Sequence, residues 1–220
     1  MSAHQPSVAQ SEPSEFSHYF APQVGAKVQA KAPVAMHCAG MTMQLSTGSG
    51  VFAKAGLDAG TQILLEAFFA AHPEPIATQK LCDLGCGWGA VGCFLSKRYP
   101  SAQIAMCDIN YRAVQLSLKN LGHNSIANAR VWCGDGLKAA QSKYFERILC
   151  NPPVRAGNAA IEALFLEAQR TLAVNGELWI VLRTQQGAKS WQKRLKEQFG
   201  NCDTVVIERG YRVLRSKNLK

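Results

Sequence analysis

The sequence has no apolar run long enough to cross a membrane. A membrane-spanning helix needs about 20 predominantly apolar residues, whereas one of the longest apolar runs here covers only residues 67–71, within an amphipathic pattern. The N-terminal segment also lacks the basic and apolar regions of a secretory signal. We therefore expect a cytoplasmic protein with no membrane segment.

Paired cysteines and clustered histidines are missing as well. None of the eight cysteines belongs to a Cys-x-x-Cys pair, and the five histidines show no spacing typical of metal ligands. These absences argue against a zinc site and against a disulfide framework. Most cysteines lie in apolar, strand-like stretches such as 148–150, so we predict free, buried thiols and no bound metal.

Acidic residues are scarce relative to basic ones. The chain has 15 Asp and Glu against 24 Lys and Arg, a formal net charge of +9. This balance favours a polyanionic partner, nucleic acid before an anionic membrane surface. Two basic clusters near the C-terminus are either a phosphate-binding surface or a solvated helix face and chain end. The clustered residues are Lys189, Lys193, Arg194, Lys196, Arg209, Arg212, Arg215, Lys217 and Lys220.

Composition and pattern divide the chain into three segments. Residues 1–15 are rich in Ser, Pro, Gln and Glu without periodicity, which is typical of a disordered lead-in. Residues 16–57 contain short strand patterns, clearest over 41–45, and predict a small N-terminal β element. We expect the main domain over 58–220, with Asp58 capping its first helix.

Strand and helix patterns alternate in the main domain. Such alternation predicts an α/β fold with a doubly wound, mostly parallel, Rossmann-like sheet of seven strands, covered on both faces. The short connection at Gly210 requires the last two strands to form an antiparallel hairpin. The predicted strands are 79–84, 102–107, 129–133, 146–150, 176–183, 203–208 and 211–215.

A glycine-rich turn follows the first of these strands. Residues 83–89 read DLGCGWG, and the alternate glycines let the backbone approach a ligand closely. Dinucleotide-binding oxidoreductases use a similar turn. The carboxylate of Asp83 separates the two ligands, because it repels a pyrophosphate but suits the ammonium group of an amino acid. The turn therefore favours S-adenosylmethionine over NAD.

The next two strands also end near an acidic residue. Asp108 closes the second strand, where its carboxylate either accepts both hydrogen bonds of a ribose diol or caps the next helix. Asp135 follows the third strand in a Gly-Asp-Gly turn, where it either accepts from an adenine amine or is only a turn residue. Because the carboxyl ends of parallel strands share one edge of a sheet, we expect the ligand site there.

The fourth strand ends in Asn151-Pro152-Pro153. Two prolines fix the backbone and remove two N–H donors, so the nearby carbonyls stay free as acceptors. The amide oxygen of Asn151 and a backbone carbonyl can hold both hydrogens of a planar amine while its nitrogen faces the methyl group of a sulfonium. These residues therefore predict methyl transfer to an amine or amide nitrogen.

The order and spacing of these motifs resemble class I methyltransferases. With the stretches 50–65 and 151–157, the chain resembles the bacterial small-subunit ribosomal RNA guanine-N2 methyltransferase family, particularly its single-domain relatives. The resemblance covers about 16–216, with 18–20 matching the family's start and 210–214 its closing hairpin. It implies methylation of the exocyclic N2 amine of a guanine in 16S ribosomal RNA, as RNA or in the assembled small subunit. The implied S-adenosylmethionine site comprises Phe52, Asp58, Thr61, Asp83, Gly85, Cys86, Gly87, Gly89, Asp108, Ile109, Asp135, Gly136 and Asn151, with Asn151, Pro152 and Pro153 catalytic.

The chain departs from the family pattern in the substrate region. Val154 stands where the family often has an aromatic residue that stacks on the target base. Val154 and Arg155 are the expected substrate contacts. The length leaves no room for the duplicated N-terminal domain of some members, so we expect RNA docking by the β element or the main domain.

Two other functions stay open at this point. Asn-Pro-Pro equally suits a protein methyltransferase that acts on a glutamine amide, although the β-like pattern of residues 34–52 argues against the helical N-terminal domain of that family. The second is a non-catalytic, cofactor-binding RNA module.

Overall fold

The computed structural model describes residues 30–48, 56–74 and 79–220. The expected lead-in over 1–15, part of the 16–57 element and the candidate residue Phe52 lie outside the described residues.

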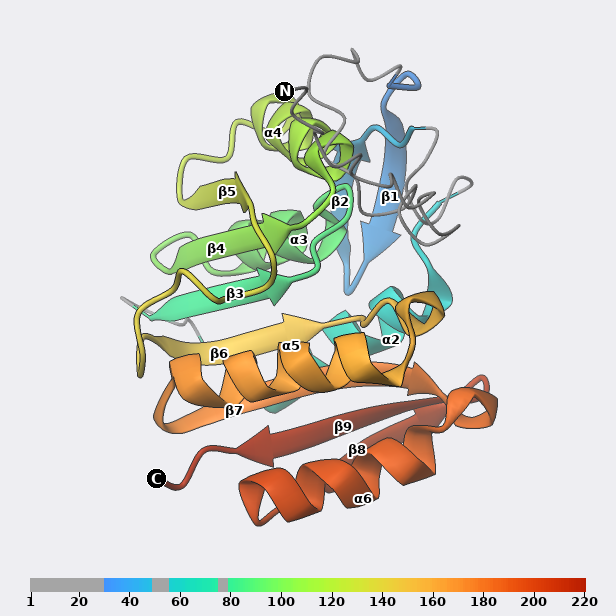
Figure 1. Cartoon of the computed structure of the whole chain (residues 1–220). Helices are drawn as coiled ribbons and strands as arrows, with labels where there is room; N and C mark the ends of the chain where they lie inside the picture. The colour runs from blue at the N-terminus through green and yellow to red at the C-terminus, as the bar shows by residue number, and fades with distance from the viewer. Residues whose placement is uncertain (1–29, 49–55, 75–78) are drawn as a thin grey trace, which may run out of the picture.

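Seven strands form the main sheet (Figure 1). They are β3 (Lys80–Leu84), β4 (Gln103–Asp108), β5 (Ala129–Cys133), β6 (Phe145–Cys150), β7 (Leu172–Arg183), β8 (Asp203–Glu208) and β9 (Tyr211–Lys217). Their order across the sheet is β5-β4-β3-β6-β7-β9-β8. The first five in this order are parallel, while β9 is antiparallel to both β7 and β8. This arrangement confirms the predicted doubly wound sheet with a closing hairpin.

Strand β7 starts four residues earlier than predicted. The pair Asn175-Gly176 is typical of a turn, which is why the sequence pattern placed the strand start after it. In the structure the pair forms a kink inside the strand, where Asn175 has a φ of 64°. Leu172 already pairs with Phe145 before this kink, and the register then shifts.

Helices cover both faces of the sheet, and each face has its own apolar core (Figure 1). Three helices contribute to one core and two to the other. They are α2 (Ala59–Ala71), α3 (Ala90–Arg98) and α4 (Tyr111–His123), then α5 (Asn158–Thr171) and α6 (Ala188–Phe199). Asp58 caps α2 as predicted, since its side chain accepts from the Thr61 N–H at 3.1 Å. Six of the eight cysteines are free and buried, as expected.

An antiparallel hairpin lies against the α2–α4 face. Its strands are β1 (Val34–Cys38) and β2 (Met41–Leu45). Two asparagines, one within α4 and one at its C-terminal cap, hold the segment through its backbone. Asn124 exchanges two hydrogen bonds with Gln44, of 2.8 and 2.9 Å. The buried amide of Asn120 accepts from the Ser46 N–H at 2.7 Å and donates to the carbonyls of Ser46 and Trp88.

Helix α3 packs closely on strand β4 because two glycines face it. A Cβ atom at Gly92 would lie 2.5 Å from the Met106 sulfur, and one at Gly89 would lie 2.8 Å from both Met106 and Ser117. Met106 is fully buried, so its side chain has no free space into which to move. The contact thus requires glycine at both positions.

The antiparallel direction of β9 splits one of the basic clusters. Arg215 and Lys217 lie near the C-terminal end of β9, which pairs with residues 177–179 of β7. There they contact the buried Glu177 at 3.9 and 3.5 Å. They therefore serve the fold. Arg209 and Arg212 lie at the opposite end, beside the carboxyl end of β7.

Glu177 is the centre of a buried polar cluster. His72 and Trp179 hydrogen-bond to its carboxylate at 3.2 and 3.0 Å, and the Arg147 guanidinium lies 3.3 Å away. Burial raises the pKa of Glu177, but these hydrogen bonds and the Arg147 charge outweigh it and lower the pKa to about 2. Glu177 consequently stabilises the fold in its ionised form.

We predict that Gly92→Ala destabilises the protein by about 1–3 kcal/mol through overpacking against Met106, which lowers the melting temperature by roughly 2–12 °C. The matched control is Gly122→Ala in α4, because a Cβ atom there would meet no heavy atom within 4 Å. That control should hold or raise the melting temperature. Equal melting temperatures of Gly92→Ala and the wild type, by calorimetry, would contradict the close packing.

We also predict a pH-dependent effect of Glu177→Gln. Since folding lowers the Glu177 pKa from its usual 4.5 to about 2, its ionised form contributes roughly 3 kcal/mol above pH 4.5, and this is lost as the pH falls towards 2. Denaturant titration should therefore show the wild type to be more stable than the variant at pH 7 and the gap to narrow by pH 3. Glu162→Gln is the control, because Glu162 pairs with Arg194 on the surface. A gap that is constant with pH would refute the assignment.

Candidate active site

A cavity of about 900 Å³ lies at the carboxyl ends of β3, β4, β6 and β7. It brings together nearly all of the site residues predicted from the sequence. Those that line it are Asp58, Thr61, Asp83, Gly85, Cys86, Gly87, Asp108, Ile109, Asp135, Gly136, Asn151, Pro152, Pro153, Val154 and Arg155. Gly89 does not line it, because this residue forms the start of α3, with a φ of 88°, and faces Met106.

The glycine-rich turn is anchored to the end of β4. The N–H groups of Gly85 and Cys86 both donate to the Cys107 carbonyl, at 3.0 and 2.9 Å. Gly85 and Gly87 have φ values of 72° and 56°, in the left-handed region that favours glycine. The turn thereby forms part of the cavity wall with main chain rather than with side chains.

Two carboxylates lie beside this turn. Asp83 is buried and accepts from the Gly92 N–H at 2.8 Å. Asp108 accepts from the N–H groups of Gly87 and Asn110, both at 2.8 Å. Its second bond is to the residue that caps α4, so Asn110, not Asp108, is the cap.

The two acids have raised pKa values. Burial raises the pKa of Asp83 to about 7, against the Gly92 hydrogen bond, and the negative charge of Asp108 adds to the increase. Burial also raises the pKa of Asp108, although the Asn110 and Gly87 hydrogen bonds oppose it. Among the described residues, neither forms a salt bridge. A cationic ligand would supply the missing countercharge.

Asp135 has a different environment. Its exposed side chain forms an ion pair with Lys138, one turn onward, at the mouth of the cavity. Both residues line the cavity, and Gly136 lies between them in the chain. The position fits the edge of a ligand rather than its charged centre.

Asn151 lies directly after β6 and contacts the start of α2. Its side-chain nitrogen donates to an Asp58 carboxylate oxygen at 3.1 Å and to the Thr61 hydroxyl oxygen at 3.0 Å. In the following turn, the Pro153 carbonyl accepts from the Ala156 N–H at 2.8 Å. The Pro152 carbonyl accepts none of the described backbone hydrogen bonds. Of the two proline carbonyls, it is therefore the one that can accept a hydrogen bond from a ligand.

Sequence reasoning missed Arg183 and Tyr211 as lining residues. They are paired across β7 and β9 at the cavity edge, and the Arg183 guanidinium donates to the Tyr211 hydroxyl at 2.9 Å and lies 4.9 Å from its ring centre. The position of Tyr211 could have been predicted from the hairpin at Gly210. The first residue after that turn must lie beside the carboxyl end of the preceding strand, β8. The cavity thus has an aromatic residue on another wall, although the Tyr211 ring is buried against Gly60 and Arg183.

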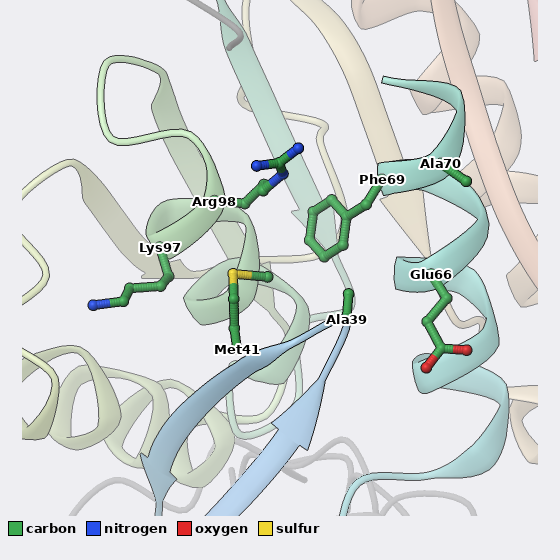
Figure 2. A pocket seen from close by; sticks show the side chains of 7 residues that line it. All are labelled: Ala39, Met41, Glu66, Phe69, Ala70, Lys97 and Arg98. Atoms are coloured by element: carbon green, nitrogen blue, oxygen red, sulfur yellow. The ribbon is translucent and has the colours of Figure 1, made fainter. Parts of the chain in front are cut away.

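A second cavity, of about 560 Å³, lies at the C-terminal ends of α2 and α3, whereas the first cavity lies at their N-terminal ends (Figure 2). The hairpin turn at Ala39 and Met41 closes one side of it, while Glu66, Phe69 and Arg98 extend from the helices. None of the site residues predicted from the sequence lines it.

The described residues contain no candidate for a membrane-spanning helix or for a metal site. No helix there is long and apolar enough to cross a membrane, and the same part of the chain has no group of three His, Cys, Asp or Glu side chains that could hold a metal ion.

The sequence pattern of the methyltransferase small domain family matches residues 42–215. The chain belongs to this family. The matched region thus begins within hairpin strand β2 and ends within β9, and it includes the other six strands of the main sheet.

Relatives of this methyltransferase domain include ribosomal RNA enzymes. The chain is 35% identical over 175 residues to the uncharacterized protein YbxB of Bacillus subtilis, covering 79% of this chain and 85% of that one. It is 32% identical over 182 residues to ribosomal RNA large subunit methyltransferase G of Stutzerimonas stutzeri, covering 79% of this chain but 46% of the relative. The chain therefore spans about half the length of that enzyme.

A solved structure shares the fold of this methyltransferase domain. It is the T. thermophilus 16S rRNA N2 G1207 methyltransferase in complex with AdoMet and guanosine. The TM-score is 0.77 at 24% identity, with 90% of this chain and 52% of that chain covered. The predicted Rossmann-like methyltransferase fold and the family resemblance are both confirmed.

Proposed function

We propose that this protein transfers a methyl group from S-adenosylmethionine to the exocyclic N2 amine of a guanine in 16S ribosomal RNA. The observation that carries the proposal is the meeting of Asp83, Asp108 and Asn151-Pro152-Pro153 in one cavity. Family membership and the ribosomal RNA enzymes among the relatives support this reaction class.

The cavity residues fit the cofactor by charge. In their ionised forms Asp83 and Asp108 make this wall negative, so a pyrophosphate against it would be repelled and a cation attracted. Asp83 would hold the amino-acid ammonium group, and Asp108 the ribose diol. When bound, S-adenosylmethionine supplies a methyl group that passes to the substrate nitrogen as the carbon–sulfur bond breaks and the nitrogen releases one proton to solvent.

Asn151 and Pro152 fit the amine. The Asn151 amide oxygen and the Pro152 carbonyl each accept one amine hydrogen and thereby fix the direction of the nitrogen. Orientation of this kind acts mainly in the transition state. Because nitrogen attack on a sulfonium methyl group needs no strong base, the two acceptors suffice.

The cavity mouth fits RNA. Arg155 and Arg183 line it and are exposed, which suits contact with phosphates. The Tyr211 ring lines the same cavity, but it is buried and packs against Gly60 and the Arg183 guanidinium, so Arg183 is the part of this pair that RNA can reach. Since the relatives also include large-subunit enzymes, the substrate test has to include 23S RNA.

The first prediction from this proposal concerns Asn151→Ala. We expect loss of detectable methyl transfer, with cofactor affinity changed by only a few-fold, because the lost contact is made in the transition state. The assay is tritium transfer to 16S RNA, 23S RNA and small subunits from a strain that lacks the gene, with mass spectrometry for N2-methylguanosine. The matched control is Asn158→Ala, an exposed asparagine that does not line the cavity. Wild-type turnover of Asn151→Ala would refute the mechanism, and a labelled product other than N2-methylguanosine would refute the target.

The second prediction concerns pH and Asp83. Because the Asp83 pKa is about 7 in the free protein and its ionised form holds the ammonium group, cofactor affinity should rise as the pH increases from 6 to 8, by up to about tenfold. Asp83→Asn should bind about 10- to 100-fold more weakly at pH 8 and should lose most of this pH dependence. Calorimetry measures both. The control Asp203→Asn removes an exposed carboxylate that pairs with Arg215. An unchanged pH profile in Asp83→Asn would contradict the role of this residue.

A further inference from the structure

The hydrogen bonds of Asn151 fix which of its side-chain atoms can meet a substrate. Both donor positions of the amide nitrogen are used, one by Asp58 and one by Thr61. The oxygen is on the other branch of the planar amide group, and it accepts no hydrogen bond from the described residues. The side of Asn151 that remains for a ligand is therefore an acceptor.

The carboxylate of Asp58 determines this orientation. An ionised carboxylate only accepts hydrogen bonds, so a flipped amide would place its oxygen about 3.1 Å from the Asp58 oxygen, with two acceptors in contact. Such a contact leaves both atoms unpaired, and the flip is disfavoured. Thr61 alone would not discriminate, because a hydroxyl both donates and accepts.

The start of α2 holds Asp58 and Thr61 in place. Asp58 is the helix cap, and the same carboxylate oxygen that meets Asn151 also accepts from the Thr61 N–H. The Tyr211 ring packs on Gly60 between them, where a Cβ atom would lie 2.8 Å from the ring. The two partners of Asn151 are thus fixed by helix capping on one side and by an aromatic contact on the other.

We propose that Asp58 and Thr61 are positioning residues that hold the Asn151 amide with its oxygen toward the substrate, and that they thereby restrict the site to nucleophiles that carry N–H hydrogens. This inference rests on the proposed function. An exocyclic amine meets the requirement. A ring nitrogen with a free lone pair and no hydrogen would need the opposite amide orientation, which Asp58 opposes.

Variants of Thr61 and Asp58 test the positioning through turnover. Thr61→Val removes one acceptor at nearly constant shape and should lower kcat about 3- to 10-fold, whereas Thr61→Ser keeps a hydroxyl acceptor and should recover most of this loss. Asp58→Asn keeps a capping side chain but permits the amide flip, and should lower kcat about 10- to 100-fold. Cofactor affinity by calorimetry should stay within about threefold in Thr61→Val, and its melting temperature should fall by no more than about 2–12 °C.

An exchange of the two side chains gives the sharper test. Asn151→Asp alone places two carboxylates at hydrogen-bond distance, whereas Asn151→Asp with Asp58→Asn restores a donor beside an acceptor. We expect the double variant to exceed the Asn151→Asp variant in kcat by about tenfold. Losses that simply multiply would mean that Asp58 acts on the fold alone, and the proposal would be overturned.

A spectroscopic measurement tests the amide orientation without any RNA. In protein labelled with ¹⁵N-asparagine, the Asn151 side-chain hydrogens should be shifted and slow to exchange, in contrast to those of the exposed Asn158, and Asp58→Asn should move them. Rapid exchange equal to that of Asn158 would overturn the proposal. Wild-type turnover in Asn151→Ala would instead refute the amine-binding mechanism, whereas an inactive Asn151→Ala with fully active Thr61→Val and Asp58→Asn would refute only the positioning.

Discussion

Helix α3 lies against strand β4 at a distance that no side chain at positions 89 or 92 would permit. Because the helix starts so close to the sheet, the preceding turn has to be tight, and Gly85 and Gly87 adopt left-handed backbone conformations there. The same approach brings the Gly92 N–H to the buried Asp83 carboxylate. The shape of the turn and the position of its acid therefore share one cause, which is the close contact of helix and strand.

Much of the fold could be predicted from the sequence because its signals are local. Alternating strand and helix patterns require crossover connections, and a two-residue link at Gly210 permits only a hairpin. The start of β7 could not be predicted in this way. Its Asn175-Gly176 pair has the local chemistry of a turn, and only the pairing of Leu172 with Phe145 reveals that the strand continues through it.

The candidate site could likewise be predicted only where the signals are local. Residues at or directly after strand ends, such as Asp108 and Asn151, could be placed because parallel strands end at one edge. Partnerships between distant residues could not, since Asp58 and Asn151 are 93 positions apart and no spacing rule links them. In the basic C-terminal cluster, by contrast, residues that are close in the sequence lie apart in the structure. Its members are neighbours in the sequence, yet the direction of β9 gives Arg215 and Lys217 to the buried Glu177 and leaves Arg209 and Arg212 at the other end.

The buried amide of Asn120 has a consequence for how the molecule is organised. One side chain binds both backbone groups of Ser46, beyond the hairpin, and the carbonyl of Trp88, within the glycine-rich turn. The hairpin is consequently not a detachable module that could be exchanged between relatives without effect on the main domain. A chain that keeps Asn120 and replaces this segment has to supply another acceptor and donor for its amide, or alter the turn on which the cavity is built.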